Sequence, residues 1–243
     1  MRQQAVVLVA GSGLRLRPLT DDRPKCLLEL GGRTILDRLL ERLADAGVTR
    51  AVLVTGYLAH RIDEYLGRQA PPVEVALAPN PQYATTNNVV SLLAARAHLG
   101  PGSLIICDGD VVLRGDAVRR LVAEPEPCAL LVDREARLAE EEMKVQLNGA
   151  GRVVRLSKSL DPSVAAGESI GIQKVGGPAL GRLWPTLEDL VRSGRTDVFY
   201  EEAFQRLIDR GTPFTTVPVT SAEWTEVDSR EDFDDARERF AGC

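Results

Sequence analysis

The stretch "VVLVAGSGLRLRPLTDDRPK", residues 6–25, indicates both the class of fold and the position of a ligand site. It begins with five aliphatic residues, Val6–Ala10, which predict a buried strand, and continues into a loop with Gly11 and Gly13. This loop carries four cationic side chains: Arg15, Arg17, Arg23 and Lys25. Open α/β sheets bind ligands outside the carboxyl ends of their strands, and glycines there let backbone N–H groups approach an anion. The stretch therefore predicts an α/β sheet whose first loop uses its cations for one anionic ligand.

Two common phosphate loops do not match this stretch. A dinucleotide-binding fingerprint requires glycine at position 16, which is Leu16, and a Walker A loop requires Gly-Lys-Ser/Thr at its end. The alternative to an anion site is a solvated basic loop that Asp21 and Asp22 partly neutralise. Arginine offers a planar fork of donors to phosphate oxygens and lysine offers a mobile point charge. Because the loop follows the first strand and contains two glycines and two prolines, we favour a polyphosphate site.

The composition limits the classes of function. The chain has 243 residues, 44% hydrophobic composition and a formal net charge of -5. A general nucleic-acid or anionic-membrane binder would have a basic excess, so neither partner is expected. No apolar segment suits a signal peptide or membrane span, and His60 and His98 complete no zinc pattern. We expect a soluble protein of the reducing cytoplasm, because the four cysteines are scattered: Cys26, Cys107, Cys128 and Cys243.

The first half of the chain alternates apolar runs with helical patterns. Helical stripes are expected from Ile35 to Leu43, ended by Gly47, and from Asn88 to Leu99. Continuous apolar strands between helices predict a Rossmann-like, mostly parallel central sheet flanked by helices on both faces. The expected strands are Ala5–Ala10, Ala51–Thr55, Val73–Leu77, Ser103–Cys107 and Ala129–Asp133.

The second half indicates antiparallel structure. Strands at Met143–Leu147 and Arg152–Ser157 flank the turn Asn148–Gly151 and predict a hairpin. A closing helix begins at Ser229, which approximates a capping box with Asp232. Without a repeat or long linker, we expect one domain over residues 1–243 that includes a small antiparallel lobe. The other expected elements are a strand at Glu168–Val175, helices at Ala179–Val191 and Val198–Asp209, and a strand at Phe214–Val219.

Two carboxylates follow the fourth of the expected strands. The segment "SLIICDGDVV", residues 103–112, places Asp108 and Asp110 at the same sheet edge as the loop at residues 11–25. Carboxylates opposite a polyphosphate loop suit a hard divalent cation that prefers oxygen ligands. A simple Asp-Gly-Asp turn is the alternative. The shared edge favours the cation.

The segment "LVAGSGLRLRPLTDDRPK", residues 8–25, resembles the signature of nucleotidyltransferases that act on sugar 1-phosphates and small phospho-alcohols. The usual form has alanine at the position of Val9. The resemblance implies a GT-A-like fold in which Arg15 holds the β- and γ-phosphates and Lys25 bridges the reacting phosphates, both as catalytic residues. It also implies nucleotide contacts from Ala10, Gly11, Ser12 and Gly13.

The same resemblance implies a magnesium site. Its ligands would be Asp110 and, from "EWTEVDSREDF" at residues 223–233, Asp228, whereas Asp108 would be structural or contact the nucleotide. The attacking phosphate or phosphonate oxygen needs no general base, because the second pKa of a phosphomonoester is about 6. The metal and the two catalytic cations would offset the repulsion between two anions and stabilise departing pyrophosphate.

The segment "NPQYATTNNVVSLLAAR", residues 80–96, resembles one branch of this family. That branch uses CTP and activates phosphocholine, 2-aminoethylphosphonate or related small compounds. Four further segments resemble the same branch: "EEMKV" (141–145), "RLSKSL" (155–160), "GESIGI" (167–172) and "FYEEAF" (199–204). The resemblance implies a nucleotide-binding half at residues 1–133 and an acceptor-binding half at residues 134–243, which includes the metal-ligand strand and the C-terminal helix.

Polar and aromatic side chains in these segments are candidate contacts. A cytosine edge suits the donors and acceptors of Tyr83, Thr86, Asn87, Asn88 and Ser91, although Asn88 also suits a helix N-cap. An ammonium pocket suits Tyr200, Trp224, Glu168, Glu201 and Glu226, with core aromatics and surface carboxylates as the alternative. Lys144 and Lys158 are candidate contacts to the acceptor phosphate or phosphonate, with solvated lysines at strand ends as the alternative.

The leading hypothesis is a Mg²⁺-dependent cytidylyltransferase that joins CMP to a small phospho-alcohol or phosphonate and releases pyrophosphate. Its partners would be CTP and this acceptor, and a homo-oligomer is left open. A sugar-1-phosphate or inositol-1-phosphate nucleotidyltransferase is the second hypothesis. A non-catalytic nucleotide-binding regulator is the third, and the intact set Arg15, Lys25, Asp110 and Asp228 argues against it.

Overall fold

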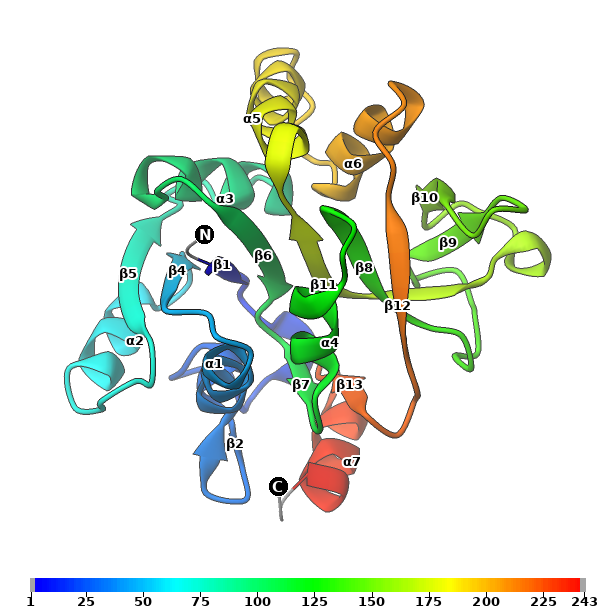
Figure 1. The fold of residues 1–243 in the computed structure, drawn as a ribbon. Coiled ribbons are helices and arrows are strands. Elements are labelled where there is room, and N and C mark those ends of the chain that lie inside the picture. Colours follow the sequence, from blue (N-terminus) through cyan, green and yellow to red (C-terminus); the bar gives the residue numbers. More distant parts are fainter. Residues whose placement is uncertain (1–2, 241–243) are drawn as a thin grey trace.

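The computed structural model of the protein describes residues 3–240 (Figure 1). Among these residues, nine strands form one large sheet in the order β10-β9-β11-β6-β1-β4-β5, with β8 beside β11 and β12 beside β8. Its parallel strands are β1 (Gln3–Val9), β4 (Arg50–Thr55), β5 (Glu74–Pro79) and β6 (Ser103–Asp108). The predicted fold class, a mostly parallel sheet flanked by helices, is confirmed.

The parallel part of the sheet fixes where a ligand can bind. β1 lies between β4 and β6, so the chain leaves β1 toward one side and later returns to its other side. Such a reversal of strand order opens a crevice outside the carboxyl ends of the two strands. Residues 11–25 follow β1 and residues 109–110 follow β6, so both segments border this crevice.

The antiparallel part continues the same sheet. β11 (Gly167–Val175) pairs with β6, with β8 (Cys128–Asp133) and, at its beginning, with β9 (Lys144–Leu147). Two further strands complete this part: β10 (Val153–Ser157) pairs with β9, and β12 (Thr215–Val219) runs parallel to β8. The sequence predicted this antiparallel lobe, and the structure attaches it to the parallel strands through β11.

Helices cover both faces of the sheet (Figure 1). Successive residues of β1 belong to opposite cores, since Ala5 and Val7 face one apolar cluster and Val6 faces the other. One face is covered by α1 (Ile35–Asp45), α2 (Ala59–Leu66) and α4 (Ala117–Ala123). The other is covered by α3 (Asn88–Ala95), α5 (Gly177–Arg192) and α6 (Glu201–Asp209).

A third apolar cluster lies under the loop at residues 11–25. It joins the fully buried Leu16 of that loop to Phe233 and Phe240 of α7 (Arg230–Phe240). The expected capping box is confirmed, because Ser229 Oγ accepts from the Asp232 N–H at 3.2 Å and Asp232 accepts from the Ser229 N–H at 2.7 Å. Short elements complete this region: β2 (Glu29–Leu30), β3 (Arg33–Thr34), β7 (Val111–Leu113), β13 (Trp224–Glu226) and 3₁₀ turns at Leu14–Leu16 and Lys25–Leu27.

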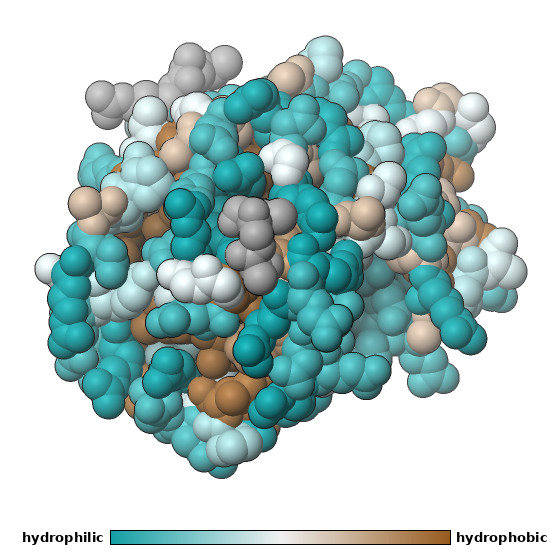
Figure 2. Space-filling view, turned by 90° about the horizontal axis from the view of Figure 1, so that it is seen from below, coloured by the Kyte–Doolittle hydropathy of each residue, from teal (hydrophilic) through white to brown (hydrophobic). Residues whose placement is uncertain are grey.

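Two further 3₁₀ turns, at Arg96–His98 and Pro162–Val164, lie outside this region. Within the described part of the chain, no helix has the length and apolar character needed to cross a bilayer. Figure 2 shows a face covered mostly by hydrophilic residues, with smaller hydrophobic areas between them. Cys26, Cys107 and Cys128 are buried free thiols, and Cys243 lies outside the described residues.

Candidate active site

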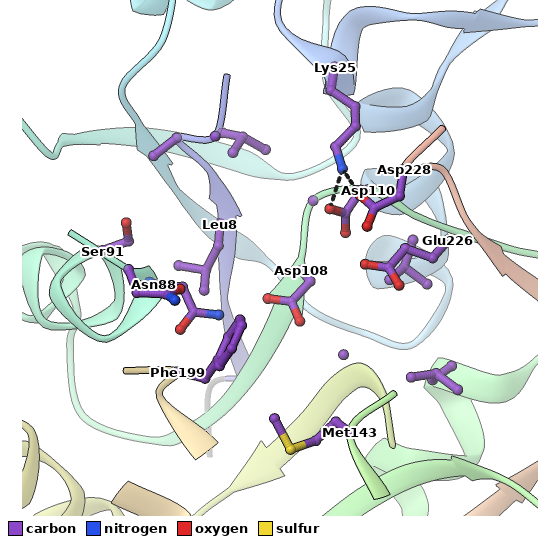
Figure 3. A pocket seen from close by; sticks show the side chains of 18 of the residues that line it. Leu8, Lys25, Asn88, Ser91, Asp108, Asp110, Met143, Phe199, Glu226 and Asp228 are labelled. Atoms are coloured by element: carbon purple, nitrogen blue, oxygen red, sulfur yellow. Dashed lines mark hydrogen bonds and ion pairs between the residues drawn. The ribbon is translucent and has the colours of Figure 1, made fainter. Parts of the chain in front are cut away.

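A cleft of about 600 Å³ lies at the carboxyl ends of β1 and β6. One side is formed by the loop after β1 and the start of α3, and the other by β11, the segment before β9, and β13. Figure 3 shows Lys25, Asp110 and Asp228 at one end of this cleft, with Asn88 and Ser91 on one wall and Met143 and Phe199 further along. The cleft therefore joins both halves of the chain.

Hydrogen bonds within the glycine-arginine loop, residues 11–25, and to the segment after β4 fix its shape. Gly13 has the left-handed backbone angle φ of 59°, and its carbonyl accepts a 2.8 Å hydrogen bond from the Thr20 hydroxyl. The Tyr57 hydroxyl donates to the Thr20 carbonyl at 2.9 Å and joins the loop to the segment after β4. Ala10, Gly11 and Gly13 line the cleft as predicted, but Ser12 is not among its lining residues.

Only two of the four loop cations face the cleft. Arg15 and Lys25 line it, whereas Arg17 pairs with Asp21 at 3.3 Å and Arg23 pairs with Asp22 at 3.1 Å on the outside. The expectation that all four cations serve one ligand is therefore wrong. The two aspartates in the middle of the loop neutralise the two outer arginines, as the solvated-loop alternative expected for part of the charge.

Lys25 lies between two carboxylates (Figure 3). Its ammonium donates to Asp110 Oδ2 at 2.7 Å and to Asp228 Oδ1 at 2.5 Å. Burial acts to lower the pKa of Lys25, but the two carboxylates raise it above its usual value, so the ammonium stays charged. Arg15 pairs with Asp228 and, at 3.2 Å, with Glu141 from the other side of the cleft. Cations and carboxylates thus meet at one point at which β1, β6 and β13 end.

The same point offers oxygen ligands to a metal. Asp110, Glu226 and Asp228 each present a carboxylate oxygen, and these oxygens lie within 4.8 Å of one another. Asp110 Oδ1 is buried without a hydrogen-bond partner, so a bound cation would satisfy it. An all-oxygen set suits Mg²⁺, and the residues therefore fit the metal that the family resemblance implies. Glu226, predicted only as an acceptor contact, joins this set because it lies two residues before Asp228.

Three residues at the start of α3 form part of one polar wall. Asn87, rather than Asn88, is the N-cap of α3, because its side chain accepts from the Asn88 N–H at 2.7 Å. Asn88 instead accepts from the Tyr200 N–H at 2.8 Å, which leaves its side-chain N–H groups for a ligand. Ser91 accepts from the Asn80 side chain at 2.9 Å, which leaves its hydroxyl hydrogen free to donate. Tyr83 and Thr86 line the same side of the cleft.

Tyr200 lies in the core rather than in the cleft. Its side chain is 0% exposed, its ring packs edge-on against Phe204, and its hydroxyl lies 2.9 Å from Gln173 Oε1 and 3.2 Å from Asp108 Oδ2. The prediction that Tyr200 contacts the acceptor is therefore wrong. The neighbouring Phe199, 37% exposed, lines the cleft in its place.

Lys144 is also buried and does not face the acceptor. Lys144 is 1% exposed. Its ammonium donates to the carbonyl oxygens of Ala139 at 2.6 Å, Glu142 at 3.2 Å and Glu140 at 3.4 Å. The predicted phosphate contact is therefore wrong. Lys144 instead fixes the segment that presents Glu141 and Glu142 to the cleft.

Five further side chains line the cleft, and we call them the acceptor end after the acceptor contact predicted for most of them: Lys158, Glu168, Phe199, Glu201 and Trp224. The Lys158 ammonium lies 4.5 Å from the centre of the Phe199 ring, and the Trp224 indole N–H donates to Asp133 Oδ2 at 2.8 Å. Burial raises the pKa of both Glu168 and Glu201 to about 7. Four of these residues were predicted, and Phe199 was not.

An irregularity in β11 shapes this end. The pairing of β11 with β8 shifts register between Ser169 and Gln173, and Gly171 has φ of 76°. A Cβ atom at Gly171 would lie 2.5 Å from Asp108 Oδ2, so the backbone and the buried carboxylate approach as closely as only glycine allows. Such a bulge beside a site turns side chains toward a ligand, and sequence alternation gave no sign of it.

Comparisons with known proteins agree with this geometry. The MobA-like NTP transferase domain matches residues 5–193. The CMP-5'-(3-aminopropyl)phosphonate synthase of Streptomyces rubellomurinus is 32% identical over 98% of the chain, which spans only 39% of that protein. The 2-aminoethylphosphonate cytidylyltransferase of Lancefieldella rimae is 26% identical over 94% of the chain and 89% of its own length.

A solved structure shares the whole architecture. The CTP:phosphocholine cytidylyltransferase of Streptococcus pneumoniae superimposes with a TM-score of 0.80, at 20% sequence identity, over 98% of this chain and 99% of its own. At this identity the likeness concerns the fold.

Proposed function

Because this chain belongs to the MobA-like NTP transferase family, we propose that it is a Mg²⁺-dependent cytidylyltransferase that transfers CMP from CTP to a small phosphonate or phosphomonoester. Family membership confirms the nucleotidyltransferase resemblance found in the sequence. The observation that carries the proposal is the convergence of Arg15 and Lys25 with Asp110 and Asp228 in a cleft whose other end is acidic and aromatic.

The residues of the cleft suit direct transfer between two anions. The acceptor oxygen attacks the α-phosphorus of CTP, a new P–O bond forms, and the bond to the β-phosphate breaks so that pyrophosphate departs. Gly11, Gly13 and Arg15 line the cleft, and in this proposal the backbone N–H groups of the two glycines and the Arg15 guanidinium hold the triphosphate. Lys25 lines the same cleft, and its proposed role is to stabilise the charge that develops in the transition state. Bound Mg²⁺, held by Asp110, Glu226 and Asp228, would supply further neutralisation of phosphate charge.

No general base is required for this reaction. A phosphomonoester is largely a dianion at neutral pH, since its second pKa is about 6, so its oxygen is ready to attack. The two carboxylates nearest the loop are already paired with Lys25 and Arg15. We therefore assign these carboxylates to metal binding and electrostatic pairing rather than to proton transfer. Among the described residues, no histidine lines the cleft to act as a base instead.

The test is a screen of pyrophosphate release. Each of the four ribonucleoside triphosphates is combined with 2-aminoethylphosphonate, phosphocholine, inositol 1-phosphate or glucose 1-phosphate, and we expect release with CTP and one of the first two acceptors. Arg15→Ala should lower turnover by about 10²–10³-fold, as the loss of a transition-state donor does. Arg17→Ala is the matched control, because Arg17 lies on the same loop but pairs outside the cleft.

Three outcomes would contradict the proposal. Equal use of all four triphosphates would exclude a cytidylyltransferase, and preference for a sugar or inositol phosphate would favour the second family activity. Binding of CTP without turnover of any acceptor would favour a nucleotide-binding regulator.

A further inference from the structure

We infer that the acceptor end selects a primary ammonium group over a quaternary one, with the Glu201 carboxylate as the residue that determines this specificity. The inference rests on the proposed function, because it concerns the second substrate of the same cleft. It starts from the number of hydrogen-bond donors that each kind of ammonium offers. A primary alkylammonium has three N–H donors, as lysine does, whereas a trimethylammonium has none.

Glu201 presents a buried hydrogen-bond acceptor that has no donor among the described residues. It lies in the first turn of α6, is 5% exposed and lines the cleft. Its Oε2 atom is buried and has no hydrogen-bond partner. Leaving a buried polar atom unpaired costs free energy, and a charged one costs more, so the arrangement is stabilised when a ligand supplies the donor.

The charges around Glu201 favour a cationic ligand. Burial raises its pKa to about 7, and the same is true of Glu168. Lys158 is the cation that acts on Glu201 in the opposite direction. The acceptor end thus has two carboxyl groups, Glu168 and Glu201, against one ammonium, and an amine on the acceptor would supply a second cation.

The aromatic side chains are poorly placed for a quaternary ammonium. Such a group is bound mainly by the faces of several aromatic rings. Phe199 and Trp224 are the aromatic members of the acceptor end as defined above, and the ring of Phe199 already has the Lys158 ammonium 4.5 Å from its centre. A trimethylammonium would therefore compete with Lys158 for Phe199 and still leave Glu201 Oε2 without a donor.

The experiment compares two acceptors that differ only in three methyl groups: 2-aminoethylphosphonate and its N,N,N-trimethyl derivative. Catalysis is followed by pyrophosphate release at saturating CTP, and binding by calorimetry with a non-reactive CTP analogue. We expect the wild-type protein to prefer the amine. Glu201→Gln should lower kcat/KM for the amine roughly 10- to 100-fold, as the loss of a hydrogen bond to a charged group does, and leave the CTP KM unchanged. The kcat/KM for the trimethyl compound should change little in this variant.

Two control variants separate this effect from a structural one. Glu202→Gln changes the next residue of α6, whose carboxylate pairs with Arg195 at 3.2 Å outside the cleft, and should keep the wild-type preference. Glu201→Asp keeps the charge but withdraws it, and should retain part of the preference.

The outcomes distinguish this inference from the proposed function. If Glu201→Gln keeps the wild-type preference for the amine, or if the wild-type protein binds the trimethyl compound as tightly, the inference is wrong while the cytidylyltransferase proposal stands. If CTP supports no turnover but calorimetry shows amine binding that depends on Glu201, the proposed function fails and the specificity inference holds.

Discussion

Replacing Lys25 with Met tests the centre of the site through stability alone. The ammonium of Lys25 separates Asp110 from Asp228 at distances of 2.7 and 2.5 Å, and the Lys25 side chain is only 15% exposed. Methionine has a similar length but no charge, so the two carboxylates would face each other without a cation. Both aspartates and the neighbouring Glu226 would then repel one another.

The size of the effect follows from this geometry. Removing one partner of a buried ion pair costs about 3–5 kcal/mol, and we take about 3 kcal/mol because the two aspartates are partly exposed. In a protein of this size, a change of 1 kcal/mol in the free energy of unfolding changes Tm by about 2–4 °C. Lys25→Met should therefore lower Tm by about 6–12 °C in the presence of a chelator. Arg17→Met, which breaks an exposed pair on the same loop, should cost at most about 1 kcal/mol.

Thermal melts with and without Mg²⁺ complete the assay. In the proposed metal site a divalent cation binds the same carboxylates, so it should raise the Tm of Lys25→Met more than that of the wild type, in which the ammonium competes for the oxygens. Saturation to 100 times Kd contributes about 2.7 kcal/mol, enough to restore most of the loss. An unchanged Tm in chelator, or equal Mg²⁺ increments in the two proteins, would refute the reasoning.

Three further predictions follow from other contacts. Burial raises the pKa of Glu201 to about 7 from its usual 4.5, so the folded protein progressively loses about 3 kcal/mol of stability as the pH rises from 4.5 to 7. In urea unfolding, Glu201→Gln should therefore be more stable than the wild type at pH 8 but not at pH 4. The kcat/KM for an amine acceptor should fall below about pH 7 as Glu168 and Glu201 gain protons, with a flat CTP KM, and a pH-independent profile would contradict this. Gly171→Ala should destabilise the protein by about 2 kcal/mol or more in the same urea assay, because its Cβ would meet Asp108 in a left-handed conformation, and full stability would rule out the close approach.

Much of the fold was predictable because the parallel strands are continuous apolar runs. The strands expected near residues 5–10, 51–55 and 103–107 match β1, β4 and β6 to within two residues. α2 and α4 were missed because they are short, with few buried residues to mark a stripe. β7 and β13 have three residues each, too few for any periodicity.

The site was predictable where a motif fixed both residue and position. Arg15, Lys25, Asp110 and Asp228 meet in one cluster as expected, although their catalytic roles stay predictions. The choice between adjacent side chains was beyond the sequence. Tyr200 lies at the N-cap of α6, where the backbone turns, and a one-residue difference decides whether an aromatic ring enters the core or the cleft.

The same limit applied to Lys144. Its position at the start of β9 resembled a solvated strand end, and its burial results from carbonyl groups of the preceding segment. Those acceptors belong to an irregular segment whose path no local pattern specifies. Long-range and irregular backbone contacts are thus the part of the site that required coordinates.

The attachment of β11 has a mechanical consequence for the cleft. β11 pairs with β6 from Ile172 to Val175, and residues 168–171, just before this pairing, line the acceptor end. Residues 167–169 pair in turn with β8 and β9, so backbone hydrogen bonds hold this wall of the cleft on both sides of the irregularity at Gly171. Paired strands open less readily than free loops do. The width of the acceptor end is therefore set by the backbone of the central sheet rather than by the conformation of a loop.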